Sequence, residues 1–277
     1  MTSWLGVRTT TATMAAVAAA FIFSIATQGQ TQTPPAYKAP RLPYGAAPNL
    51  NGTWQVANTA NWDLQDHQGA RSPILAMGGW GAIPPGLSVV ERNEIPYKPE
   101  ALAKKKENFQ KRLELDPEMK CYLPGVPRAI YMPYPFKIVQ TATSILMSFQ
   151  YANTSRVIDM KKVPKAPVDT WMGYASGKWE GDTLVVDSRG FNDRTWFDRA
   201  GNFHSEALQV VERFTPMSAD VLNYEATITD PNVFTRPWKI SMPLYRRVGR
   251  DAELLEFNCV EFVEEMMYGD FVKKPTK

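Results

Sequence analysis

A succession of short segments in which apolar and polar residues alternate constrains the fold of this 277-residue chain more than any other feature. In the clearest segment, Leu222, Tyr224, Ala226 and Ile228 alternate with polar residues, and residues 238–244 repeat the pattern. A period of two is typical of β-strands with one face in the core. The pattern predicts about nine strands, over residues 50–57, 136–142, 145–151, 155–160, 171–179, 183–188, 208–214, 222–228, 238–244 and 253–260, with residues 155–160 either continuing the strand before them or pairing beside it.

The connections between these segments are mostly short. Glu180-Gly181-Asp182 is a good hairpin turn between two of them. Short connections favour antiparallel pairing, which suits a closed barrel or a sandwich. In the predicted strand over residues 208–214, Glu212 shares a face with Val210 and Phe214.

Residues 99–115 are the one clear helical segment. Pro99 suits a first helical turn, and glutamates precede lysines by four positions in the favourable order. Leu102, Phe109 and Leu113 fall near one face and form a narrow apolar stripe. We therefore expect a mostly-β domain over residues 49–277 with one helical insertion.

The first residues carry the pattern of an export signal over residues 1–26. Arg8 supplies a positive charge, residues 14–26 form an uncharged apolar stretch of 13 residues, and cleavage is expected before Thr27. A membrane span needs about 20 apolar residues, so an uncleaved anchor is the alternative but not the expectation. Residues 27–48 are polar and Pro-rich, which is typical of a flexible leader.

Export changes the interpretation of the two cysteines. In an oxidising compartment Cys121 and Cys259 are expected to form a disulfide, and two free buried thiols are the alternative. The expected location is periplasmic or secreted, with no stable membrane span after signal cleavage.

The charge balance argues against a nucleic-acid partner. The chain has 31 Lys and Arg residues and 28 Asp and Glu residues, which gives a net charge of +3. Nucleic-acid binding instead requires basic residues clustered on one surface. The chain contains no Gly-rich phosphate loop, and we expect no cofactor. The sequence does not indicate an oligomeric state.

Gly52-Thr53-Trp54 opens the first predicted strand after the leader, and the strands that follow it form a meander; in both features the chain is similar to calycin (lipocalin-like) barrels. Longer motifs lie at residues 116–128, 179–187, 190–201, 203–206 and 230–238. Through these motifs the chain resembles a family of exported, mostly uncharacterised bacterial proteins with a lipocalin-like barrel, over nearly all of its length after the signal. The resemblance implies a single antiparallel lipocalin-like β-barrel and export, and it implies no reaction.

Residues 190–213, between two predicted strands, hold the most side chains capable of chemistry. A long loop at the open end of a barrel is a plausible wall or lid for a ligand. His204 is a candidate general acid or base, with Asp198 or Glu206 orienting its ring. A structural histidine bonded to a backbone carbonyl is the alternative.

A second polar cluster, residues 58–67, follows the first predicted strand and should also lie at the barrel rim. Its candidate ligand-binding residues are Trp62, Asp63 and His67, and an ordinary surface loop is the alternative. If the two loops meet, His67 and His204 with a carboxylate have the residue types for a divalent metal. They form no compact motif, however, so we expect no metal site.

The remaining candidates are cations, rings and one amide. Arg128 and Arg236 are candidate anchors for an anion, although ordinary ion pairs explain them equally well. Tyr134 and Trp196 are candidates to stack on a flat ligand, and Asn192 to hydrogen-bond it.

Two main functions follow from these residues. The first and favoured one is an exported barrel with a pocket that binds a small apolar or aromatic molecule. The alternative is a cofactor-free enzyme of lyase, isomerase or hydratase type, in which a His204–carboxylate pair moves a proton in the same pocket. A third possibility, an interaction module without a small ligand, predicts a filled barrel and a large exposed apolar patch.

Overall fold

The structure, a computed structural model, describes residues 37–72, 74–161, 166–249, 252–268 and 270. The expected signal peptide, residues 1–26, and residues 27–36 of the expected leader lie outside the described residues. The rest of that leader packs on the barrel: Leu42 is buried, and Arg41 donates a hydrogen bond to Asp182 at 2.7 Å.

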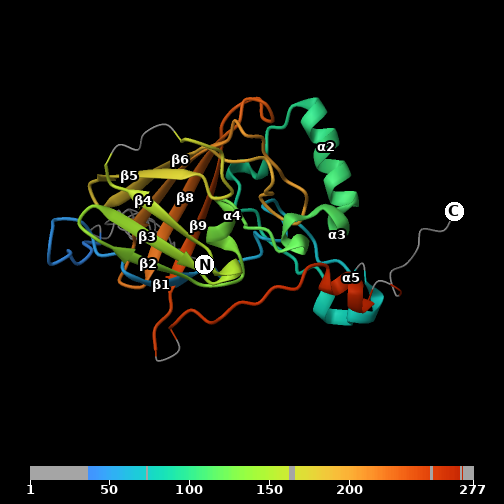
Figure 1. Cartoon of the computed structure of the whole chain (residues 1–277), viewed down its shortest axis with the longest axis horizontal. Helices are drawn as coiled ribbons and strands as arrows, with labels where there is room; N and C mark the ends of the chain where they lie inside the picture. Colours follow the sequence, from blue (N-terminus) through green and yellow to red (C-terminus); the bar gives the residue numbers. More distant parts are fainter. Residues whose placement is uncertain (1–36, 73, 162–165, 250–251, 269, 271–277) are drawn as a thin grey trace, which may run out of the picture. The chain divides into compact units, whose positions relative to one another are not determined.

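Nine strands of the described residues form a closed barrel in chain order (Figure 1). The barrel closes where β1 pairs with β9, for example Trp54 opposite Arg246. The mostly-β barrel is thereby confirmed. The strands are β1 (Gly52–Gln55), β2 (Phe136–Gln140), β3 (Ser144–Phe149), β4 (Ser155–Asp159), β5 (Tyr174–Glu180), β6 (Thr183–Arg189), β7 (Gln209–Pro216), β8 (Val221–Thr229) and β9 (Trp238–Arg246).

The expected antiparallel order holds for every neighbouring pair of these strands except β4 and β5. Those two are parallel, with Ile158 opposite Ala175, so the barrel is mixed. To pair in parallel with β4, strand β5 must begin at the same end of the barrel as β4, so the chain has to cross back between them. The connection between β4 and β5 is accordingly longer than a tight hairpin turn such as the one between β5 and β6. The β5–β6 hairpin turns at Gly181, whose φ of 59° suits the first position of a two-residue turn.

The expected last strand, residues 253–260, is wrong. This segment is extended but belongs to no strand, and it is bonded to the β3–β4 connection, where Asn153 donates to the carbonyl of Phe257 at 2.7 Å. Pairing of β9 with β1 leaves no free edge for another strand. The predicted disulfide between Cys121 and Cys259 is confirmed, and it ties this segment to the rest of the domain.

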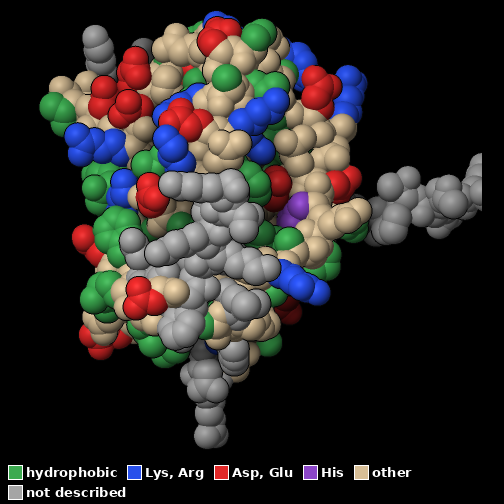
Figure 2. All heavy atoms as spheres, turned by 90° about the vertical axis from the view of Figure 1, so that its right-hand side faces the viewer, with side chains coloured by type: hydrophobic (Ala, Val, Ile, Leu, Met, Phe, Trp, Pro, Cys, Tyr) green, Lys and Arg blue, Asp and Glu red, His purple; other side chains and the backbone are tan. Residues whose placement is uncertain are grey.

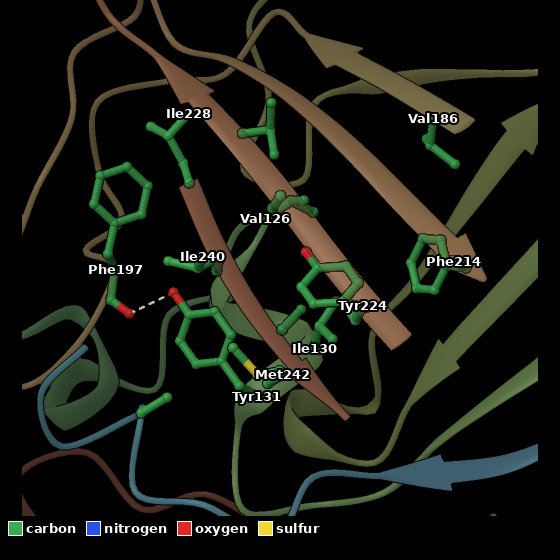
Figure 3. Close-up of a cluster of buried hydrophobic side chains, with 14 of the residues drawn as sticks. Val126, Ile130, Tyr131, Val186, Phe197, Phe214, Tyr224, Ile228, Ile240 and Met242 are labelled. Atoms are coloured by element: carbon green, nitrogen blue, oxygen red, sulfur yellow. Dashed lines mark hydrogen bonds between the residues drawn. The ribbon is translucent and has the colours of Figure 1, made fainter. Parts of the chain in front are cut away.

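Side chains fill the barrel interior. The inward residues of β7, β8 and β9 are buried as the alternation predicts, including Phe214, Tyr224 and Ile240. The short helix α4 (Arg128–Tyr131), which the sequence did not predict, adds Ile130 and Tyr131 to the same cluster (Figure 3). The barrel interior is thus occupied by side chains of the strands and of α4.

The helical insertion differs from the prediction in length and in its buried face. Residues 99–115 form α2 (Pro99–Gln110) and α3 (Arg112–Leu115), and α2 buries Ala101 and Asn108 rather than the apolar stripe. The reason is the partner surface: Asn108 donates to the carbonyl of Gly201, where the backbone comes so close that a Cβ would lie 2.8 Å from Phe109 N. Phe109 and Leu113 of the stripe instead line a cavity.

The remaining elements are short. α2, α3 and α5 (Val263–Tyr268) lie on the same side of the barrel (right in Figure 1). None of the helices in the described part of the chain has the length and apolar character needed to cross a bilayer. The remaining short elements are the 3-10 helices η1 (Leu75–Gly81), η2 (Glu91–Asn93), η3 (Pro117–Lys120) and η4 (Tyr151–Asn153).

Candidate functional site

A cavity of about 400 Å³ lies between the β1–η1 connection and the α2–α3 insertion. None of its described lining residues belongs to a barrel strand. The volume falls within the range of about 300–1,000 Å³ typical of small-molecule pockets. Its apolar and aromatic wall includes Trp62, Ile74, Met77, Ile83, Phe109, Leu113 and Met119, and its ionisable residues are Asp63, His67, Arg112, Asp116 and Arg199.

Local turns place the predicted residues Trp62, Asp63 and His67 on one wall of this cavity. Trp62 N–H donates to the carbonyl of Thr59 at 2.8 Å, and the Asp63 carboxylate accepts from Gln65 N–H at 2.9 Å. These bonds fold residues 58–67 into consecutive turns directly after β1. Trp62, Asp63 and His67 of the predicted cluster therefore lie at one site.

His67 is held in one tautomer. Its Nδ1 lies 2.8 Å from the carbonyl oxygen of Gln65, and because a carbonyl only accepts, Nδ1 carries the proton. Nε2 is therefore the basic nitrogen, and it is buried with no hydrogen-bond partner among the described residues. A side chain at Gly86 would collide with this imidazole, so the glycine permits the packing.

A buried ionic network lies beside the cavity. Glu118 receives Nη2 of Arg128 at 2.7 Å and both Nε and Nη2 of Arg199, at 2.7 and 2.6 Å. Burial alone would raise the pKa of Glu118, but Arg199 and Arg128 outweigh it and hold that pKa at about 2. Arg128 also binds Asp116 and Asn61, so this predicted anion anchor is already satisfied within the protein.

The network also fixes an aromatic surface of the cavity. The Arg199 guanidinium lies over the Trp62 ring at 4.3 Å while it binds Glu118. A cation stacked on an indole and held by a carboxylate restrains both side chains. The position of Trp62 thus depends on a glutamate that lies 56 residues further along the chain (118 − 62).

Three carboxyl groups at or near the cavity have raised pKa values, and for Asp116 the main cause is burial. Burial raises the pKa of Asp63, and burial together with the charge of Asp63 raises the pKa of Asp198 to about 7. Asp198 accepts hydrogen bonds from Leu64 N–H and from both the backbone and the side chain of Asn202. Asp198 therefore holds the loop behind Asp63, and it does not bond to His204.

His204 lies apart from the main cavity, in a shallower depression beside Trp196. Its Nδ1 donates to the Ser205 carbonyl at 2.9 Å, and its Nε2 accepts from the Thr195 hydroxyl at 2.6 Å. Burial lowers its pKa, which favours this neutral form. Neither predicted carboxylate partner, Asp198 or Glu206, is hydrogen-bonded to the ring in the described part of the chain, and Glu206 is exposed.

The structure places three further candidates away from the cavity. Tyr134 packs against Phe257, Asn192 accepts from the backbone of Arg194, and exposed Arg236 pairs with Glu94 at 3.1 Å. Within the described ranges no group of three or more His, Cys, Asp or Glu residues could hold a metal ion.

Sequence reasoning missed the α3 side of the cavity. Arg112 donates through Nη1 to the carbonyl of Phe109 at 2.9 Å, and its guanidinium lies over the Phe109 ring at 4.4 Å. Burial lowers its pKa. The available signal was the apolar stripe containing Phe109 and Leu113, which now lines the cavity beside this arginine.

The chain matches no protein-family model, no curated protein and no solved structure. The function is therefore inferred from the geometry of the cavity.

Proposed function

We propose that the protein is an exported, lipocalin-like barrel protein that binds a small, largely apolar or aromatic molecule in the cavity between the β1–η1 connection and α3. The observation that carries the proposal is the cavity itself, about 400 Å³ with Trp62 and Phe109 in a mainly apolar lining. The intramolecular disulfide supports a periplasmic or secreted location, because such bonds persist in oxidising compartments.

The site departs from a binding pocket in the barrel lumen. Strand order in this barrel follows the chain, as in up-and-down barrels, but Ile130 and Tyr131 occupy the interior. The ligand is thus proposed to bind against the loops at the barrel's side, where Trp62 and Phe109 offer rings for stacking.

A second candidate function, cofactor-free acid–base catalysis, is supported by two ionisable residues of the cavity. The raised pKa of Asp63 suits proton donation, and Nε2 of His67 is a basic nitrogen without a partner. Because both ring nitrogens of His204 are engaged elsewhere, Asp63 and His67 are the better proton-transfer pair for lyase, isomerase or hydratase chemistry.

The test incubates the purified protein with a metabolite extract rich in small aromatic compounds and analyses it by mass spectrometry. Retention of about one equivalent of a compound supports binding, and loss of many equivalents with a new product supports catalysis. Ala70→Trp, which fills the cavity, should abolish either result, and Ala103→Trp on the exposed face of α2 should not. If Ala70→Trp changes nothing, or no compound is retained or consumed, the proposal fails.

A further inference from the structure

We infer that the ligand of the cavity is a small aromatic carboxylate, whose anionic group binds Arg112 and whose ring packs against Phe109 and the apolar wall. The inference rests on the proposed small-molecule function and adds the chemical class of the ligand and the residue that selects it.

The argument begins with the pairing of the cations around the cavity. Arg128 is bound by Asp116 and Glu118, and Arg199 is bound by Glu118 through two nitrogens. Arg112 differs from both, because none of the described carboxylates lies within 4.0 Å of its guanidinium. Its one hydrogen-bond acceptor in the described part of the chain is the carbonyl of Phe109.

A guanidinium at the wall of an apolar cavity is a strong recognition group. Its planar array of N–H donors matches a carboxylate with two parallel hydrogen bonds, and reduced access to water strengthens them. Packing on the Phe109 ring at 4.4 Å limits the movement of Arg112, so less entropy is lost when an anion binds. The remaining Arg112 nitrogens have no acceptor among the described residues.

The charges of the lining favour a monoanion over a phosphate-like dianion. Asp116 is paired with Arg128, and Arg112 is the one lining arginine without a carboxylate partner among the described residues, so a single guanidinium faces a single anionic group of the ligand. The other walls offer rings and aliphatic side chains, including Ile83 and Leu113. A flat apolar body with one carboxylate satisfies both surfaces. Basic and acidic side chains are also interspersed on the face that carries α2 and α3, which gives no single-sign surface for a polyanion (Figure 2).

Isothermal titration calorimetry with matched probes tests the inference. The probes are benzoate and benzamide, indole-3-acetate and indole-3-acetamide, and 2-naphthoate and 2-naphthamide, in which the amide keeps the shape and removes the charge. In at least one pair the acid should bind about tenfold or more tightly than the amide, as expected for charge-assisted hydrogen bonds. Arg112→Met should remove this preference while leaving amide affinity within about threefold, and Arg112→Lys should keep only part of it.

Arg194→Met, an exposed arginine outside the cavity lining, is the matched control and should bind like the wild type. Thermal melting verifies that each variant is folded. If acids and amides bind equally, or if Arg112→Met keeps the acid preference, the inference is overturned while the small-molecule function stands. If none of the six probes and no extract compound binds, the proposed function itself fails.

Discussion

The replacement Glu118→Gln tests the ionic network that joins the cavity wall to the barrel. Gln keeps the shape of the side chain and removes its charge. In the wild type the carboxylate accepts hydrogen bonds from Nη2 of Arg128 and from Nε and Nη2 of Arg199, and its side chain is only 10% exposed. The change therefore leaves two guanidinium groups without part of their charge compensation.

The magnitude follows from the pKa of Glu118, about 2 in the folded protein against 4.5 for the ordinary group. A folded-state pKa that is depressed stabilises the fold above the unfolded-state pKa, and this stability is lost as pH falls through the folded value. The difference corresponds to about 3 kcal/mol at pH 7 and to about half of that at pH 3. The variant should lack this contribution at both pH values.

Guanidinium denaturation of the disulfide-intact protein at pH 7 and pH 3 measures both free energies of unfolding. The difference in the free energy of unfolding between wild type and Glu118→Gln should fall by about half at the lower pH. Glu114→Gln removes an exposed carboxylate of α3 and should change neither value by more than about 0.5 kcal/mol. A gap below about 1 kcal/mol at pH 7, or one that does not narrow at pH 3, would refute the reasoning.

Three further changes test other parts of the structure. Glu212→Gln removes the charge that Arg156 binds inside the barrel at 2.6 Å, and denaturation should show a loss of about 3–5 kcal/mol; a loss under about 1 kcal/mol would contradict a structural ion pair. His204→Ala should cost about 1–3 kcal/mol by leaving a buried hydroxyl unpaired, without weakening ligand retention; lost retention would instead give the imidazole a role in binding. Reduction of Cys121–Cys259 should lower the melting temperature, and an unchanged value with both thiols titrated would remove the bridge's structural role.

The alternation of apolar and polar residues predicted a strand best where the strands that pair with it on both sides show the same alternation. Residues of β8 face β7 and β9 with inward side chains at every second position, so local pattern and pairing agree. The same alternation over residues 253–260 misled, because an extended segment acquires a strand's hydrogen bonds only if a sheet edge is free. Closure of β9 on β1 removes that edge, and closure depends on residues about 190 positions apart (246 − 54 = 192).

The sequence predicted part of the candidate site because some of its residues lie close together in the chain. Trp62, Asp63 and His67 lie within one short cluster, and local turns bring them together. Arg112 and Arg199 reach the cavity from other parts of the chain, and no local pattern records which cation has a partner. The helix stripe was identified, but the surface it faces was not, because Asn108 packs on backbone rather than on an apolar sheet.

The barrel interior and the cavity wall contain separate buried ion pairs. The Arg156–Glu212 pair lies among the inward residues of the strands, whereas Glu118 holds Arg199 against Trp62 on the cavity wall. Both replacements should destabilise the fold, since both uncouple buried charges. Only Glu118→Gln should also weaken retention of an aromatic ligand at a temperature where each variant is fully folded. Equal weakening by Glu212→Gln would mean that the cavity senses the packing of the barrel rather than the restrained position of Trp62.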